Sequence, residues 1–252
     1  MKPTRRAGSV MGGWIVAACL AAGQGAAQAQ PVVDAPEQTG YKPYSGQPGK
    51  DVVWVPTQQA LVDRMLDLAR VAPGDYLVDL GSGDGRTVIT AARRGVRAHG
   101  IEFNPDMVAL AQRNARDANV ERLATFERGD IFETDFSRAT VVTLFLLPNL
   151  NLKLRPTLLR MAPGTRIVSN SFAMGDWEPD RAIDVGDDCT NFCRAFEWIV
   201  PARVDGTWRL PQGTLTLTQS FQHVRGTMVN DGHEEAVTDG IVRGRHLVFT
   251  VA

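Results

Sequence analysis

The chain has 252 residues, 44% of them hydrophobic and 22% charged, which is the composition of a soluble globular protein with a sizeable core. Its 27 Lys and Arg residues nearly balance 28 Asp and Glu residues, and the formal net charge is −1. This balance offers no basic surface for nucleic acid or for an anionic membrane. The length favours one domain with an appendage.

Residues 1–29 have the features of a secretory signal peptide. They contain three bases and no acid, an apolar run from Val10 to Ala22, and the small-residue cleavage pattern Ala27-Gln28-Ala29. The apolar run is too short for a comfortable membrane span. We therefore expect cleavage near Ala29 and an exported, periplasmic or secreted, protein without stable membrane insertion.

Removing the signal peptide takes three bases and no acids from the totals of 27 and 28, which leaves 24 against 28 and a net charge of −4. Two other kinds of signal are weaker alternatives. A lipoprotein cleavage box would end at Cys19, but the apolar run continues past it. A twin-arginine signal would use Arg5-Arg6, but apolar residues do not follow closely enough.

Residues 30–52 are expected to form a linker or N-terminal arm, because prolines and glycines interrupt them and hydrophobic periodicity is weak. DVVWVPT, at 51–57, predicts a short strand closed by Pro56. An amphipathic helix is predicted from Gln58 to about Val71.

A strand, a glycine-rich turn and a helix follow one another in YLVDLGSGDGRTVITAARR. Residues 76–80 predict a buried parallel strand with an acid, Asp79, near its end. The turn alternates glycines with polar residues, and a helix starts at Arg86. This arrangement begins the nucleotide site of open α/β sheets, in which side-chain-free positions admit the ligand. The predicted contacts are Asp79, Gly81, Ser82, Gly83, Asp84 and Gly85.

Two further strand ends carry acids. The strand at 97–101 leads into Glu102, placed to accept hydrogen bonds from ribose hydroxyls. The strand at 124–126 leads to Asp130-Ile131, a carboxylate and an apolar residue suited to an adenine amino group and ring face. The spacing GxGxG differs from the GxGxxG of dinucleotide folds.

DLGSGDGR, IEFNP and GDIF, in this order, resemble the class I, seven-strand, S-adenosylmethionine-dependent methyltransferases over roughly residues 53–177. The resemblance implies a doubly wound, mostly parallel seven-strand sheet, with S-adenosyl-L-methionine as cofactor and a methyl acceptor as partner. In many members an N-terminal arm lies across the cofactor, so residues of the arm become candidates for the pocket or for packing on the sheet edge. These candidates are Tyr41, Tyr44, Trp54 and Thr57.

Other residues near the predicted pocket have two possible roles. Asn104 precedes the helix predicted at 105–118, where it fits an N-cap and is also a candidate ribose contact. Arg86 is a candidate partner for the cofactor carboxylate or for a nearby acid.

The stretch ATVVTLFLL at 139–147 predicts a central strand, and the loop Pro148-Asn149 after it should face the methyl group. Asn149 is the candidate for orienting an acceptor, or else an ordinary turn residue. A helix is predicted at 152–161 and a fifth strand at 165–169. TLFLLPNLNLKLRPTLLRMAPGTRIVSNSF resembles seven-strand protein-lysine methyltransferases, and it lacks the Asn/Asp-Pro-Pro-aromatic signature of amide and base methylation.

After the signal peptide two cysteines remain, Cys189 and Cys193, which could form a disulfide, stay as free thiols or supply half of a metal site. Metal binding is disfavoured because no second cysteine pair or histidine cluster accompanies them. From Phe196 the chain predicts strands, with hairpin turns at Asn230-Asp231-Gly232 and Asp239-Gly240. The expected division is a methyltransferase domain at 53–202 and a β-rich extension at 203–252.

The leading hypothesis is therefore an S-adenosylmethionine-dependent methyltransferase with an unidentified protein or small-molecule acceptor, a protein lysine being favoured. The alternative is an exported module that binds the same nucleotide without turnover. A nicotinamide-dependent oxidoreductase is disfavoured by the glycine spacing and by the lack of a Tyr-xxx-Lys set.

Overall fold

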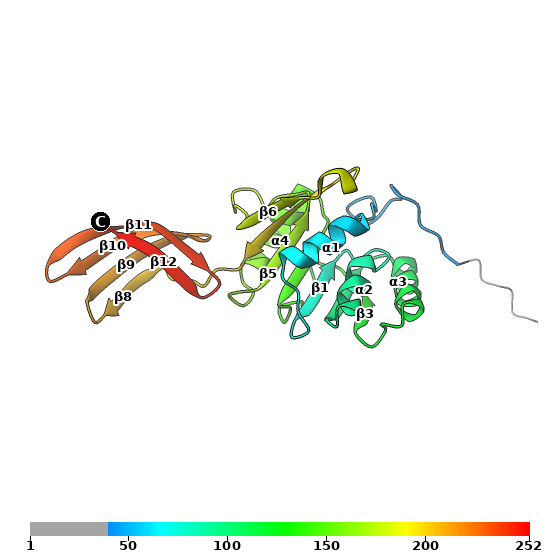
Figure 1. The fold of residues 1–252 in the computed structure, drawn as a ribbon, viewed down its shortest axis with the longest axis horizontal. Helices are drawn as coiled ribbons and strands as arrows, with labels where there is room; N and C mark the ends of the chain where they lie inside the picture. The colour runs from blue at the N-terminus through cyan, green and yellow to red at the C-terminus, as the bar shows by residue number, and fades with distance from the viewer. Residues whose placement is uncertain (1–39) are drawn as a thin grey trace, which may run out of the picture. The chain divides into compact units, whose positions relative to one another are not determined.

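Seven strands pair into one sheet in the computed structural model, which describes residues 40–252 (Figure 1). The predicted signal peptide and residues 30–39 of the arm lie outside the described residues. The strand order is β3-β2-β1-β4-β5-β7-β6. The strands are β1 (Tyr76–Leu80), β2 (Arg97–Glu102), β3 (Ala124–Arg128), β4 (Val141–Leu144), β5 (Arg166–Asn170), β6 (Arg181–Asp184) and β7 (Arg194–Ile199).

The direction of pairing confirms the predicted fold class. Strands β3, β2, β1, β4 and β5 are parallel, whereas β7 is antiparallel to both β5 and β6. The chain leaves β1 toward β2 on one side and later returns to β4 on the other side. Ligands of open α/β sheets bind beyond the carboxyl ends of strands at such a reversal.

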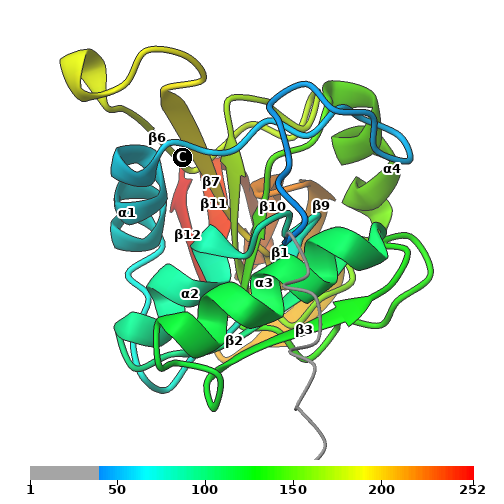
Figure 2. The same ribbon diagram turned by 90° about the vertical axis from the view of Figure 1, so that its right-hand side faces the viewer.

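Two apolar cores cover the two faces of this sheet, and successive strand residues alternate between them. Leu77 packs with α1 (Gln59–Leu68), α2 (Arg86–Arg93) and α3 (Pro105–Asp117). Val78, the next residue, packs with α4 (Pro148–Leu158) on the opposite face. In Figure 2, α2 and α3 lie toward the viewer.

The predicted strand at 139–147 is too long, and the helix after it begins earlier than predicted. Pairing of β4 with β1 ends at Leu144, opposite Leu80, because the chain after β1 turns away at Gly81. Phe145, Leu146 and Leu147 therefore leave the sheet. Pro148 then starts α4, where its fixed φ suits the first turn.

The segment 51–57, predicted as a strand, forms no strand here. It crosses the carboxyl end of the sheet, and its backbone bonds stay within the arm: Gly46 N–H donates to the Trp54 carbonyl at 2.7 Å, and Trp54 N–H to the Gln47 carbonyl at 2.9 Å. Strand β6 was not predicted, because its four residues carry two charges and no apolar run.

Five strands, β8 (Gly206–Leu210), β9 (Gly213–Ser220), β10 (His223–Asn230), β11 (His233–Arg243) and β12 (His246–Val251), form a second, antiparallel sheet in sequential order. This confirms the predicted β appendage, whereas its division from the first domain at 202/203 stays a prediction. Asp231-Gly232 forms the predicted hairpin turn. Asp239-Gly240 does not, since it is a bulge inside β11, with φ 53° at Asp239.

Cys189 and Cys193 form a disulfide, which settles the three alternatives for this pair. Their Cα atoms are 5.5 Å apart, within the usual range. The bridge closes a loop after the short helix η1 (Gly186–Asp188). Among residues 40–252, no helix combines the length and the apolar character that a membrane crossing requires.

Candidate functional site

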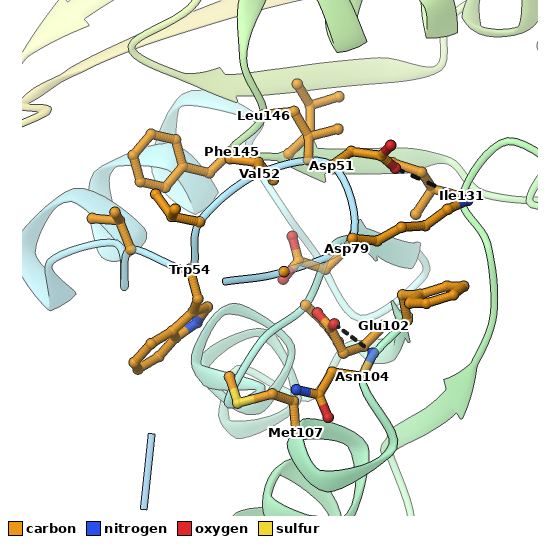
Figure 3. Close-up of a pocket in the computed structure, with 18 of the residues that line it drawn as sticks. Asp51, Val52, Trp54, Asp79, Glu102, Asn104, Met107, Ile131, Phe145 and Leu146 are labelled. Carbon is orange, nitrogen blue, oxygen red and sulfur yellow. Dashed lines mark hydrogen bonds and ion pairs between the residues drawn. The ribbon is translucent and has the colours of Figure 1, made fainter. Parts of the chain in front are cut away.

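A pocket with an empty volume of about 1060 Å³, open space at its mouth included, lies beyond the carboxyl ends of β1, β2, β3 and β4 (Figure 3). Open α/β sheets bind their ligands at this edge, beyond the carboxyl ends of the strands where the strand order reverses. The sequence-predicted residues that line it are Thr57, Asp79, Gly81, Ser82, Asp84, Glu102, Asn104, Asp130 and Ile131.

Of the three glycines predicted as contacts in the turn after β1, Gly81 lines the pocket, whereas Gly83 and Gly85 do not. Gly81, Gly83 and Gly85 have φ values of 79°, 53° and 83°, a region that side-chain-bearing residues rarely adopt. A Cβ at Gly83 would overlap the Trp54 indole nitrogen, and one at Gly85 would lie 2.9 Å from the Ala111 methyl group. Neither position therefore tolerates a side chain without rearrangement.

Ser82 and Asp79 bring polar groups into the apolar interior of the turn. The Ser82 hydroxyl is buried next to Gly100 of β2 and has no hydrogen-bond partner among the described residues. Burial raises the pKa of the Asp79 carboxyl to about 7, although the Thr143 hydroxyl donates to it at 2.6 Å. The charges of Glu102 and Asp84 raise this pKa further.

The Glu102 carboxylate links the glycine turn to the start of α3. It accepts a hydrogen bond from Gly83 N–H at 3.0 Å and another from Asn104 N–H at 2.9 Å. A carboxylate has about four acceptor sites, so two remain for ribose hydroxyls. Asn104 is the N-cap of α3, since its side chain accepts from Asp106 N–H at 2.9 Å.

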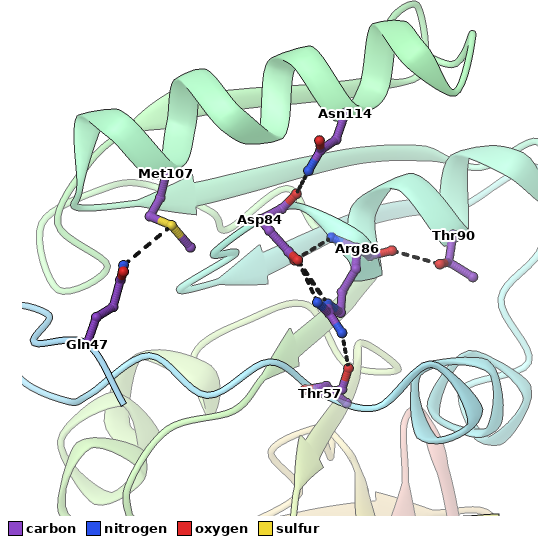
Figure 4. Close-up of polar contacts among 7 residues, drawn as sticks. All are labelled: Gln47, Thr57, Asp84, Arg86, Thr90, Met107 and Asn114. Atoms are coloured by element: carbon purple, nitrogen blue, oxygen red, sulfur yellow. Dashed lines mark hydrogen bonds and ion pairs between the residues drawn. The ribbon is translucent and has the colours of Figure 1, made fainter. Parts of the chain in front are cut away.

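Arg86 pairs with Asp84 and with the arm (Figure 4). Its Nη2 lies 2.6 Å from Asp84 Oδ2, and its Nη1 donates to the Thr57 carbonyl at 2.8 Å. Of the two predicted roles for Arg86, the structure therefore has the pairing with an acid near the turn. Thr57 is held in turn by Asn170, whose amide donates to its hydroxyl at 3.1 Å.

Asp130 forms an ion pair with Lys50 of the arm. This contact, with the Phe132 N–H that donates to Asp130 at 2.9 Å, holds the pKa of the carboxyl below its usual range. The Lys50 ammonium also lies 4.9 Å from the centre of the Phe103 ring. Lys50 and Phe103 line the pocket and were missed. Lys50 belongs to no motif, and Phe103 lies inside IEFNP but was given no role there.

The arm candidates divide between the pocket and the surface. Trp54 and Thr57 line the pocket, and Tyr41 and Tyr44 do not. Tyr44 is exposed, and the Tyr41 hydroxyl accepts from the Gln47 amide at 2.6 Å. Gln47 itself reaches Met107 Sδ at 3.7 Å and brings the arm against α3 (Figure 4).

At the end of β4 the pocket wall is apolar and consists of Leu144, Phe145, Leu146 and Leu150 (Figure 3). Asn149, the predicted acceptor-orienting residue, does not line the pocket. It is exposed in the first turn of α4 rather than in a loop, because the helix starts at Pro148. Its role toward an acceptor has no support in this geometry.

The donor set fits an adenosyl sulfonium ligand. Acidic side chains stand at or after the ends of β1, β2 and β3, and alternate positions of the turn after β1 are glycines without side chains. Among residues 40–252, no group of three His, Cys, Asp or Glu side chains is arranged to hold a metal ion. The arrangement binds and orients ligands through hydrogen bonds, charge and apolar contact.

Comparison with known proteins agrees with this geometry. The family model described as the ANTKMT methyltransferase domain matches residues 79–181. A protein-lysine N-methyltransferase of Saccharolobus islandicus is 43% identical over 143 residues, which cover 56% of this chain and 89% of that protein.

An animal relative is more distant. The adenine nucleotide translocase lysine N-methyltransferase of Mus musculus is 35% identical over 139 residues, which cover 54% of this chain. The match spans only 60% of the length of that relative.

A solved structure is also similar. It is described as an RNA methyltransferase from Salinibacter ruber in complex with S-adenosyl-L-homocysteine. It is 51% identical, with a TM-score of 0.56, and the match covers 60% of this chain and 96% of that one.

Proposed function

The chain belongs to the class I S-adenosylmethionine-dependent methyltransferases, in the branch of the protein-lysine N-methyltransferases, and from this premise we propose that it methylates the ε-amino group of a lysine in a protein. S-adenosylmethionine is its methyl donor. The names of the archaeal and animal relatives support a lysine acceptor. The match with the archaeal protein extends over most of that protein's length.

One observation carries the proposal. Asp79, Glu102 and Asp130 stand around one glycine turn, with the apolar end of β4 beside them. Glu102 would hold the ribose, and Asp130 with Ile131 would hold the adenine. S-adenosylmethionine, when bound, supplies a methyl group on a positively charged sulfur atom.

In the reaction, the protein aligns the methyl donor with the acceptor and excludes water from the site. Phe145, Leu146 and Leu150 give the acceptor side an apolar wall. Removing an amine from water favours its neutral form, whose lone pair is the nucleophile. A new carbon–nitrogen bond forms as the carbon–sulfur bond breaks, and the surplus proton of the nitrogen passes to solvent. Alignment of these atoms is sufficient for a large acceleration.

RNA is the second candidate acceptor, because the similar Salinibacter ruber structure is described as an RNA methyltransferase. Sequence features weigh against it here. The chain without residues 1–29 has 24 bases against 28 acids and therefore no excess of positive charge. It also lacks the Asn/Asp-Pro-Pro-aromatic sequence.

We propose that the mature enzyme is exported. The support is the sequence of residues 1–29, with its basic start, apolar run and small-residue end. N-terminal sequencing of the mature protein from fractionated cells should begin at Gln30. A cytoplasmic protein that begins at residue 1 would contradict export.

Transfer of tritium from methyl-labelled S-adenosylmethionine tests the acceptor. The purified mature chain is incubated with a cell-envelope protein extract and, in parallel, with total RNA from the same cells. We expect label in protein, recovered as methyl-lysine after acid hydrolysis. Label confined to RNA, or to another amino acid, would contradict the proposal. The Glu102→Ala variant is the control for background transfer.

A further inference from the structure

Three phenylalanines from separate segments meet beside the pocket. Phe145 follows β4 and lines the pocket, Phe172 follows β5, and Phe192 belongs to the disulfide loop. The Phe145 and Phe172 rings are stacked with centres 6.1 Å apart. Phe192 lies at an angle to both, with centres 5.2 Å from Phe145 and 6.0 Å from Phe172. We call these three residues the phenylalanine cluster.

The cluster is continuous with the pocket and also reaches solvent. Phe145 forms part of the pocket wall, whereas Phe192 is 43% exposed. The cluster therefore joins one exposed apolar ring to the wall of the pocket. A ligand entering along the cluster would therefore pass from Phe192 to Phe145.

Polar contacts and backbone geometry hold two of the rings in place. The Phe172 carbonyl accepts hydrogen bonds from the Ser169 hydroxyl at 2.7 Å and from the buried Asn151 amide at 3.1 Å. Phe192 has φ 57°, an uncommon value for a bulky residue that persists only where its surroundings enforce it.

The disulfide loop constrains the backbone of Phe192. Cys189 and Cys193 close it on both sides of Phe192. Gln58, next to the pocket residue Thr57, donates to Thr190 Oγ1 at 2.9 Å and to the Asn191 carbonyl at 3.3 Å. The loop is thereby tied to the same segment that lines the pocket.

The charge of the pocket lining favours a cationic ligand. Its lining contains the acids Asp51, Asp79, Asp84, Glu102 and Asp130, but only two bases, Lys50 and Arg86. Aromatic faces attract alkylammonium groups and pack against aliphatic chains. Aromatic rings that stack nucleic-acid bases normally accompany a basic groove, and this lining is acidic.

We propose that the phenylalanine cluster is the entrance for the acceptor lysine, with the disulfide loop as the element that positions Phe192. The lysine stem runs along the rings, and its amino group points into the pocket. This assignment rests on the proposed function, because it takes the acceptor to be a lysine. Phe192 acts on acceptor specificity and leaves cofactor binding to the glycine turn and Glu102.

Binding can be measured without turnover. The mature chain, with ring-labelled phenylalanine and saturated with S-adenosylhomocysteine, is titrated with Nα-acetyl-lysine methylamide and followed by NMR. Leucine variants of each ring assign the signals. We expect saturable shifts of the Phe145, Phe172 and Phe192 rings. The uncharged norleucine analogue should bind about fivefold more weakly, since it lacks the cation.

Variants separate recognition from packing. Phe192→Leu keeps an apolar side chain and should weaken lysine binding several-fold without changing the affinity for S-adenosylhomocysteine. The double variant C189S/C193S removes the disulfide that closes the loop. It should likewise weaken lysine binding without changing the affinity for S-adenosylhomocysteine. Trp208→Ala, which removes an exposed aromatic side chain of β8, is the matched control and should change neither affinity.

Several results would overturn the assignment. These are shifts confined to other rings such as Phe103, equal binding of the lysine and norleucine probes, no shift up to the solubility limit, or stronger shifts with adenosine monophosphate. The tritium-transfer experiment tests the proposed function independently of the lysine entrance. Lysine methylation with an unchanged KM in Phe192→Leu would refute the entrance alone, and binding at the cluster without methyl transfer would refute the proposed function alone.

Discussion

Lys50 and Asp130 are 80 residues apart in the sequence and form an ion pair at the rim of the pocket. The pair joins the N-terminal arm to the segment after β3. Since Asp130 is also the proposed adenine contact, the arm and the cofactor meet at one carboxylate. The arm is thus part of the binding site as well as its cover.

Lys50→Met should loosen the arm. The substitution removes the ion pair and the contact with the Phe103 ring, whereas Trp54 and Gln47 keep theirs. Limited proteolysis should then cut between residues 40 and 57 several times faster than in the unmodified chain. Lys42→Met, in the same arm, serves as the control. Equal cleavage rates in both variants would show that the Lys50 contact does not hold the arm.

Glu102→Ala should weaken cofactor binding strongly. The substitution removes the acceptor for Gly83 and Asn104 as well as the proposed ribose contact. Hydrogen bonds to a charged group contribute roughly 1.5–3 kcal/mol, so a loss of about a hundredfold in affinity for S-adenosylhomocysteine is expected by calorimetry. Glu102→Gln, which keeps one acceptor oxygen, should lose less. Unchanged binding in the alanine variant would disprove the ribose assignment.

Asp79 should make the binding of the methyl donor depend on pH. Burial raises the pKa of its carboxyl in the folded protein to about 7, so this residue is protonated in the ligand-free pocket at acidic pH. A cationic sulfonium favours the ionised form. The affinity for S-adenosylmethionine should therefore rise between pH 6 and 8. The affinity for S-adenosylhomocysteine, whose sulfur carries no charge, should rise less. Asp79→Asn should abolish the difference; if the variant keeps it, another group is responsible.

The same pKa has a consequence for stability with the opposite pH trend. The folded pKa of Asp79 exceeds the unfolded value near 3.8, so the folded state binds more protons between pH 4 and 7. The contribution of Asp79 to the free energy of unfolding is therefore fully present below pH 4, and it is lost as the pH rises toward 7. Asp79→Asn should raise the free energy of unfolding at pH 8 by roughly 1–4 kcal/mol in chemical denaturation. A variant less stable than the unmodified chain at pH 8 would contradict this.

Gly83→Ala should disturb the contact between the glycine turn and the arm. Its φ of 53° disfavours a side chain, and the new methyl group would overlap the Trp54 indole. We expect a loss of roughly 1–3 kcal/mol in the free energy of unfolding. In the double variant G83A/W54A part of that loss should disappear, because the overlap is removed. Strict additivity of the two single effects would mean that the two side chains do not interfere.

The sequence was most informative where the determinants are local. The glycine turn, Glu102 and the Asn104 cap could be predicted because each depends on neighbouring residues along the chain. The Lys50–Asp130 pair could not, since it joins segments far apart with no motif at Lys50. Asn149 was misplaced because the end of β4 depends on where β1 stops pairing, which local hydrophobicity does not reveal.

The hairpin signals illustrate the same limit. Asp231-Gly232 turns the chain as predicted, whereas Asp239-Gly240, the same dipeptide, is a bulge within β11. Residues 241–243 after the bulge continue to pair with β12, so pairing across the sheet overrides the local turn preference.

The central claim is that the acidic residues around the glycine turn hold the adenosyl group of the methyl donor. A crystal structure of residues 30–252 with S-adenosylhomocysteine tests this most directly. The account predicts ribose hydroxyls on the Glu102 carboxylate and adenine against Asp130 and Ile131, with the sulfur directed toward Phe145. An adenosyl group bound elsewhere, or a pocket that stays without an adenosyl group at saturating ligand, would contradict it.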